Sequence, residues 1–89
     1  MKEEVLTLRN RLGLHARAAA KFVHAAASFE SKITITKDGD EVDGKSILGL
    51  LLLAAAQGSA LLVKVEGKDE AAALTAVQEL IDRRFDESE

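Results

Sequence analysis

The sequence contains no cysteine, no proline, no tryptophan and no tyrosine, and only three of its 89 residues are phenylalanine. Without cysteine there can be no disulfide, no thiolate metal site and no thiol nucleophile. The scarcity of aromatic rings predicts an aliphatic core and argues against a stacking platform for single-stranded nucleic acid. Because no proline- or serine-rich linker divides the chain, we expect one domain over residues 1–89.

A basic excess and a long apolar run are also missing. The formal net charge is −3, so no general basic surface attracts the protein to phosphate backbones. The longest strongly apolar run, "ILGLLLLAAA" at 47–56, is too short to cross a bilayer as a helix. The N-terminal "MKEEVLTLRN" has acidic residues where a signal peptide would be apolar. We therefore expect a soluble, cytoplasmic protein that binds no nucleic acid and does not insert into membranes.

Three segments alternate apolar and polar residues, which is the pattern of half-buried strands. They are "EVLTLRN", "SKITITK" and "SALLVKVEG". After the second segment, Asp38-Gly39 predicts a tight hairpin into a fourth strand, because both central residues of such a turn need a positive φ. The residues that share one face within each segment are Leu6 with Leu8, Ile33 with Ile35, and Leu61 with Val63 and Val65.

Three further segments have the composition and periodicity of helices. The first covers residues 16–28, where apolar residues recur at three- and four-residue steps. Ser46 is a good N-cap for the second, "ILGLLLLAAAQ", and Gly58 is well placed to end it. Asp69 is expected to cap the third, whose apolar stripe reaches Phe85. The order β-α-β-β-α-β-α predicts an α+β domain, with an antiparallel sheet covered by helices on one face and open to water on the other.

The stretch "GLHARAAAKF" at 13–22 places an imidazole and a guanidinium at the start of the first helix. If His15 is the N-cap, the first-turn amides have no partner inside the helix and form an anion site with the helix dipole. The dipole also disfavours a cationic ring, so we expect His15 to be a neutral nucleophile near pH 7. The backbone N–H groups of Ala16, Arg17 and Ala18, with the Arg17 guanidinium, would hold a phosphoryl group on that ring.

A histidine at a helix start can also be a plain cap or surface residue, and the local chemistry alone leaves that interpretation open. The second histidine, His24, lies roughly two and a half turns further along the helix and cannot share a ligand with His15. We expect it to be a solvated surface residue. The sequence shows no paired carboxylates and no serine-histidine-acid set, and nothing in it indicates a hydrolase, a metal site or a cofactor.

The sequence resembles the HPr family, the histidine-containing phosphocarrier proteins of the phosphoenolpyruvate-dependent phosphotransferase system. The resemblance covers essentially the whole chain, and the blocks "GLHAR" and "GKSILG" are specific when they occur together. Four stretches match in order and spacing: "NRLGLHARAAAKFV" at 10–23, "DGDEVDGKSILGLLLLAAAQGS" at 38–59, "VKVEGKDEAAAL" at 63–74 and "LIDRRF" at 80–85.

This resemblance implies an open-faced β-sandwich, in which three helices pack on one side of a four-stranded antiparallel sheet. It implies that Nδ1 of His15 accepts a phosphoryl group from enzyme I and passes it to a IIA-type protein or domain, while Arg17 contacts the phosphate. The chain would then be a carrier and not a turnover enzyme. The exposed apolar residues of a common docking surface would include Ala20, Ile47, Leu48 and Leu51.

One departure from the family pattern concerns residue 18, where the common "HARPA" is "HARAA". Proline in a first helical turn sacrifices no hydrogen bond and fixes φ, whereas alanine there frees one more N–H and relaxes the backbone slightly. We expect Ala18 to tune the phosphoryl site without abolishing it, because His15 and Arg17 are both present. The resemblance also implies that a serine at the position of Ser46 is phosphorylated in regulated members by a dedicated kinase, HPr kinase. Whether the chain serves sugar uptake or a nitrogen-related regulatory relay stays open.

Two other functional classes stay open beside the carrier. A purely regulatory HPr-like module would bind partners without relaying phosphate, but it would have no need for His15 with Arg17. A small-molecule-binding domain of the ferredoxin-like type is compatible with the strand order, but the third helix and the "GLHAR" loop do not suit it. For a protein that meets two partners through one face, a monomer is the expected state.

Overall fold

The computed structural model describes residues 1–88 and confirms the predicted order of strands and helices. A single 3-10 turn, η1, follows the last helix. The elements are β1 (Lys2–Thr7), α1 (Ala16–Ala27), β2 (Lys32–Lys37), β3 (Asp40–Asp43), α2 (Ile47–Leu52), β4 (Ala60–Glu66), α3 (Glu70–Asp82) and η1 (Arg84–Asp86).

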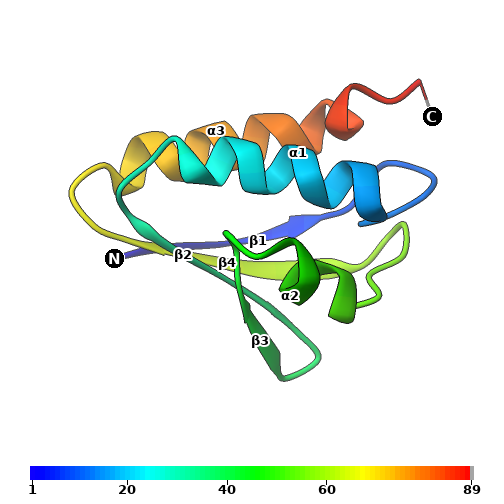
Figure 1. Cartoon of the computed structure of the whole chain (residues 1–89), viewed down its shortest axis with the longest axis horizontal. Helices are drawn as coiled ribbons and strands as arrows, with labels where there is room; N and C mark the ends of the chain where they lie inside the picture. Colours follow the sequence, from blue (N-terminus) through cyan, green and yellow to red (C-terminus); the bar gives the residue numbers. More distant parts are fainter. Residues whose placement is uncertain (89) are drawn as a thin grey trace.

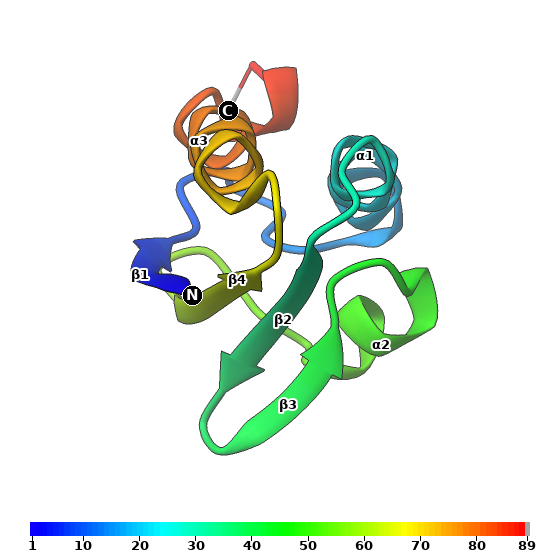
Figure 2. The same ribbon diagram turned by 90° about the vertical axis from the view of Figure 1, so that its left-hand side faces the viewer.

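The four strands form one antiparallel sheet in the order β1-β4-β2-β3. Figure 2 shows α1 and α3 side by side above the sheet and α2 beside β3, so the helices lie on one side and the other side is open. This is the open-faced α+β arrangement that we expected. No helix among residues 1–88 has the length and apolar character that a bilayer crossing requires.

The alternation in the strands predicts the core correctly. The residues that share a face in β1, β2 and β4 are buried, whereas Val5 on the opposite face of β1 is 61% exposed. Each large aliphatic side chain that is fully buried contributes about 1.5–3 kcal/mol to folding. The buried face is made by Leu6, Leu8, Ile33, Ile35, Leu61, Val63 and Val65 from the sheet side, packed against Phe22, Val77 and Ile81 from the helices.

The hairpin between β2 and β3 has the predicted turn. Asp38 has φ 51° and Gly39 has φ 87°, so both central residues are in the left-handed region. A turn of this kind has the twist of the two strands that it joins.

The second helix is shorter than the sequence indicates, and the prediction that it ends at Gly58 is wrong. It ends at Leu52, and Ala54 has φ 49°. Beyond that point the chain packs against the segment that leads into α1, where the Leu14 N–H donates to the Ala55 carbonyl over 2.9 Å. The Gly58 N–H likewise donates to the Leu8 carbonyl over 2.9 Å, whereas in a helix continued to Gly58 it would donate to the Ala54 carbonyl. Tertiary contacts therefore override the local helix preference.

The expected capping role of Asp69 is also corrected. Asp69 is at the N-cap position of α3, but its side chain makes no capping hydrogen bond. Instead it accepts hydrogen bonds from the loop between α1 and β2: one from the Glu30 N–H and one from the Ser31 N–H, each over 3.0 Å, and a third from the Ser31 hydroxyl. These bonds lower the pKa of Asp69 from 3.8 to about 2, the Ser31 hydroxyl having the largest effect.

The C-terminal segment turns back toward α1. Arg84, Phe85 and Asp86 have φ of 58°, 55° and 61°, and the Phe85 ring is fully buried. Lys21 of α1 donates from Nζ to the Phe85 carbonyl over 2.6 Å. Figure 1 shows that this turn lies at the same end of the molecule as the start of α1.

Candidate functional site

His15 is the N-cap residue of α1, as the sequence indicates. Its backbone is extended, with φ −77° and ψ 177°, and its carbonyl accepts the first helical hydrogen bond, from the Ala19 N–H over 2.8 Å. The residue before His15 is anchored, because the Leu14 N–H donates to the Ala55 carbonyl. The His15 side chain makes no capping hydrogen bond, so the imidazole is available for other contacts.

The first turn of α1 provides the amides that we expected around His15. The N–H groups of Ala16, Arg17 and Ala18 precede the first hydrogen bond inside the helix, so they have no partner within it. The Ala18 side chain is fully buried, whereas Ala16 and Arg17 are exposed. Within residues 1–88 the Arg17 side chain makes no hydrogen bond or ion pair. Its guanidinium can therefore contact an anion without first breaking an interaction.

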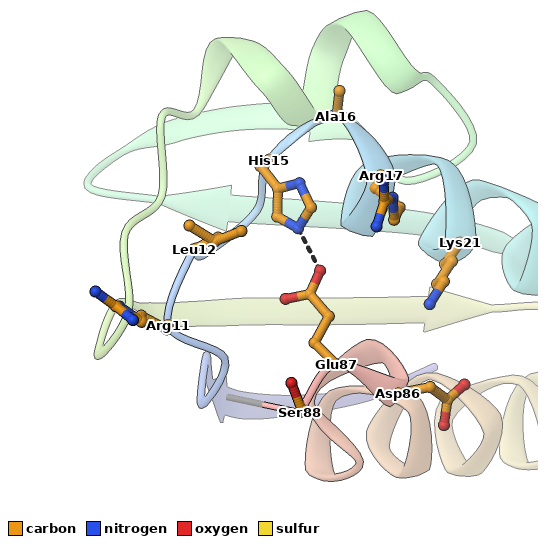
Figure 3. Close-up of a pocket in the computed structure, with 9 residues that line it drawn as sticks. All are labelled: Arg11, Leu12, His15, Ala16, Arg17, Lys21, Asp86, Glu87 and Ser88. Atoms are coloured by element: carbon orange, nitrogen blue, oxygen red, sulfur yellow. Dashed lines mark hydrogen bonds and ion pairs between the residues drawn. The ribbon is translucent and has the colours of Figure 1, made fainter.

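A carboxylate that the sequence analysis missed lies against the imidazole. Figure 3 shows Oε2 of Glu87 in contact with Nε2 of His15. The other carboxylate oxygen, Oε1, accepts a hydrogen bond from Nδ2 of Asn10 over 2.9 Å. Asn10 is fully buried, and the same Nδ2 donates to the Gly13 carbonyl over 2.6 Å. No local pattern predicts this cluster, since Glu87 and His15 are 72 residues apart.

The charge of Glu87 changes the electrostatic expectation for the site. Burial acts to raise the pKa of Glu87, but the hydrogen bond from Asn10 and the contact with His15 outweigh it and lower the pKa below its ordinary value. Glu87 is therefore ionised at neutral pH. This negative charge lies against Nε2 of His15, whereas our expectation considered only the helix dipole.

The imidazole borders an open pocket of about 840 Å³, which can accommodate a phosphoryl group. Three cationic side chains line it, those of Arg11, Arg17 and Lys21, together with two carboxylates, those of Asp86 and Glu87. Their combined charge suits an anion. Among residues 1–88, no group of three or more histidine, cysteine, aspartate or glutamate side chains is placed to hold a metal ion.

Ser46 has the capping role that the sequence predicts. Its Oγ accepts a hydrogen bond from the Gly49 N–H over 3.0 Å, and its own N–H donates to the Asp43 carbonyl over 3.1 Å. Gly49 packs closely on β3, because a Cβ added there would lie 3.2 Å from Cβ of Val42. The start of α2 is thus held by a side-chain cap.

The four apolar residues named for docking are all exposed, with Leu48 at 68%. The helices that carry them, α1 and α2, pack against each other. Two further large apolar side chains, Leu12 and Leu52, are 66% and 73% exposed and were not among the residues named. His24 is exposed, as expected. The four docking residues are Ala20, Ile47, Leu48 and Leu51.

Comparison with known proteins shows the family. Residues 2–83 match the family described as "PTS HPr component phosphorylation site". A phosphocarrier protein HPr of Xylella fastidiosa is 48% identical over 87 residues, 98% of each chain, and one of Neisseria meningitidis is 44% identical over 89 residues, all of each chain. A crystal structure of HPr from Thermoanaerobacter tengcongensis has a TM-score of 0.96 at 42% identity, with both chains fully covered. The chain therefore belongs to the HPr family of phosphocarriers of the phosphotransferase system.

Proposed function

We propose that His15 is the residue on which this phosphocarrier holds its phosphoryl group. Phospho-enzyme I is the donor, and a IIA-type protein or domain is the acceptor. The observation that carries the proposal is the start of α1. There the His15 side chain makes no capping hydrogen bond and lies beside the free amides of Ala16, Arg17 and Ala18. The unpaired guanidinium of Arg17 adds a second source of positive charge, and amides and guanidinium together bind phosphate oxygens well.

The transfer is an in-line displacement between two histidines. Nδ1 of His15 forms a bond to phosphorus, the bond from phosphorus to the donor nitrogen breaks, and the electron pair leaves with that nitrogen. Positioning and electrostatic stabilisation of the phosphoryl oxygens supply most of the acceleration in such reactions. The second transfer, to the IIA-type acceptor, repeats these steps with His15 as the leaving group.

Both partners dock on the exposed apolar residues beside His15, namely Ala20, Ile47, Leu48 and Leu51. The exposure of these side chains supports the assignment, since apolar patches of this kind mark interaction surfaces. The protein acts as a monomer in the cytoplasm, in either a sugar-uptake or a nitrogen-related branch.

Ser46 is a second input in this proposal. A phosphate on its Oγ would lie at the N-terminus of α2, where negative charge is favourable for the fold. It would also put nearly two negative charges next to Ile47 and Leu48 and would disfavour docking of an acidic partner. HPr kinase is the enzyme class that would attach it.

Intact-protein mass spectrometry tests the carrier function. The protein is incubated with enzyme I, phosphoenolpyruvate and Mg²⁺, alongside His15→Ala and His24→Ala. We expect one acid-labile phosphate on the wild type and on His24→Ala, and none on His15→Ala. The His24 variant is a matched control, because it removes the other histidine of the same helix. A folded wild type that gains no mass from its cognate enzyme I would favour the purely regulatory module and make Ser46 the next residue to test.

A further inference from the structure

We propose that Glu87 is a positioning residue for phosphoryl transfer, which keeps a proton on Nε2 of His15 and so leaves Nδ1 as the nucleophilic nitrogen. This inference rests on the proposed function of His15. It gives the C-terminal segment a role of its own, the placement of the proton on the His15 ring. The first-turn amides and Arg17 do not have this role.

The chemistry of the two side chains determines the position of the proton. An ionised carboxylate can only accept hydrogen bonds, so its contact with Nε2 requires a hydrogen on that nitrogen. A neutral imidazole has one N–H, and its other nitrogen then has a free electron pair. Figure 3 shows Nδ1 of His15 on the side of the ring that faces Ala16 and Arg17. The free electron pair is thus directed to the region where a phosphoryl group would be held.

The Glu87 carboxylate is itself held in place, which separates this contact from a casual surface ion pair. Its side chain is only 15% exposed. One oxygen contacts His15 and the other accepts from Asn10, whose side chain is fully buried. The buried ring of Phe85, two residues earlier, anchors the backbone that carries Glu87. Glu87, the hydrogen-bonding partner of the proposed nucleophile, is thus oriented by a third, fixed group, as is usual in nucleophilic catalysis.

The same contact stabilises the product of the first transfer. When Nδ1 bonds to phosphorus and Nε2 keeps its hydrogen, the ring becomes a cation. Glu87 then lies beside that positive charge, on the side of the ring away from the phosphoryl group. No proton has to leave or enter the ring in either transfer. Glu87 therefore acts through His15 and does not need to touch the phosphoryl group.

The tautomer of His15 can be measured directly from the ¹⁵N chemical shifts of its ring, at about pH 8.5 where an ordinary imidazole is neutral. We expect hydrogen on Nε2 in the wild type. In Glu87→Gln the amide N–H₂ can donate to Nε2, so we expect a large share of the Nδ1–H tautomer and a fall of about ten- to a hundredfold in the rate of phosphorylation by enzyme I. A wild-type ring with its hydrogen on Nδ1 would overturn the inference without any variant.

Asp86→Asn is the matched control. It removes a carboxylate from the neighbouring residue of the same turn, and Figure 3 shows that the Asp86 carboxylate points away from the imidazole. Asparagine is also tolerated at the positive φ of residue 86. We expect this variant to keep the wild-type tautomer, and amide spectra of both variants check that they fold.

The outcomes for the two proposals are distinct. A wild type that enzyme I does not phosphorylate contradicts the proposed function, whatever the tautomer is. If the wild type and Glu87→Gln are phosphorylated at the same rate, only the role of Glu87 is contradicted. A reduced rate with an unchanged tautomer also contradicts it, because it would show a structural effect that does not act through the ring.

Discussion

The starts of α1 and α2 differ in what they do with their free amides. At α2, Oγ of Ser46 accepts a hydrogen bond from the Gly49 N–H, so the N-cap side chain serves the helix itself. At α1, the N-cap is His15, whose side chain makes no such bond and contacts Glu87 instead. The first helix start forgoes a cap worth about 1 kcal/mol. In return, it presents unpaired N–H groups beside the His15 imidazole.

The start of α3 is a third case. Asp69 is at the N-cap position, but its carboxylate binds the loop that joins α1 to β2. The three N-cap side chains therefore have three tasks: His15 contacts the C-terminal Glu87, Ser46 caps its own helix and Asp69 binds a distant loop. A residue type at an N-cap does not by itself specify which of these tasks it performs.

The largest effect is expected from making the start of α1 resemble that of α2. The substitution His15→Ser removes the nucleophile and introduces a good cap. We expect no acid-labile phosphate in the mass spectrum after treatment with enzyme I and phosphoenolpyruvate. The free energy of unfolding in urea should stay within about 1 kcal/mol of the wild type, because the new cap offsets the lost contact with Glu87. An acid-labile phosphate on this variant would place the carrier site elsewhere.

The next largest effect is expected when the guanidinium is removed from the first turn of α1. In Arg17→Ala we expect the rate of phosphorylation in rapid-quench assays to fall about a hundredfold, as when one donor to a developing charge is removed. The midpoint of thermal unfolding should not change, since Arg17 is exposed. Arg9→Ala is a control that removes the same charge from another exposed position. Equal losses in both variants would indicate that only the net charge matters.

A smaller effect is expected at α3, where Asp69→Asn weakens the clamp on the loop. The pKa of Asp69 is lowered to about 2 in the folded protein, so the ionised carboxylate stabilises the fold above the ordinary aspartate pKa. That stabilisation is lost as the pH falls toward 2. We expect the variant to have a Tm several degrees lower at pH 7, and the difference to shrink between about pH 4 and pH 2. A difference that stays constant over this range would show that ionisation of Asp69 is not its cause.

The smallest effect is expected at α2. The substitution Ser46→Ala removes the bond to the Gly49 N–H and should lower the free energy of unfolding in urea by about 1 kcal/mol. Phosphorylation of His15 should proceed as in the wild type, since Ser46 acts on its own helix. If the unfolding curves coincide, the cap contributes no measurable stability, and the contrast between α1 and α2 would be one of geometry only.

Much of the fold could be predicted because its determinants are local. The alternation of Ile33 with Ile35 identifies the buried face of β2, and Asp38-Gly39 identifies the hairpin, since each pattern depends on a few neighbouring residues. The N-cap positions of His15 and Ser46 could be predicted for the same reason. The role of the exposed apolar residues of α2 remains a prediction, because exposure does not identify a partner.

The sequence by itself determined the order of the elements, the inward faces of the strands, the starts of the helices and the family. Periodicity, turn preference and motif spacing are properties of adjacent residues, and they hold whatever the rest of the chain does. Only the tertiary structure decided that α2 ends at Leu52, that Asp69 clamps a distant loop and that Glu87 meets His15. Each of these outcomes depends on segments that are far apart in sequence and come into contact only when the core closes. Ala54 and Phe85 have a positive φ, a backbone conformation that residues with a side chain disfavour locally. Those same contacts stabilise it.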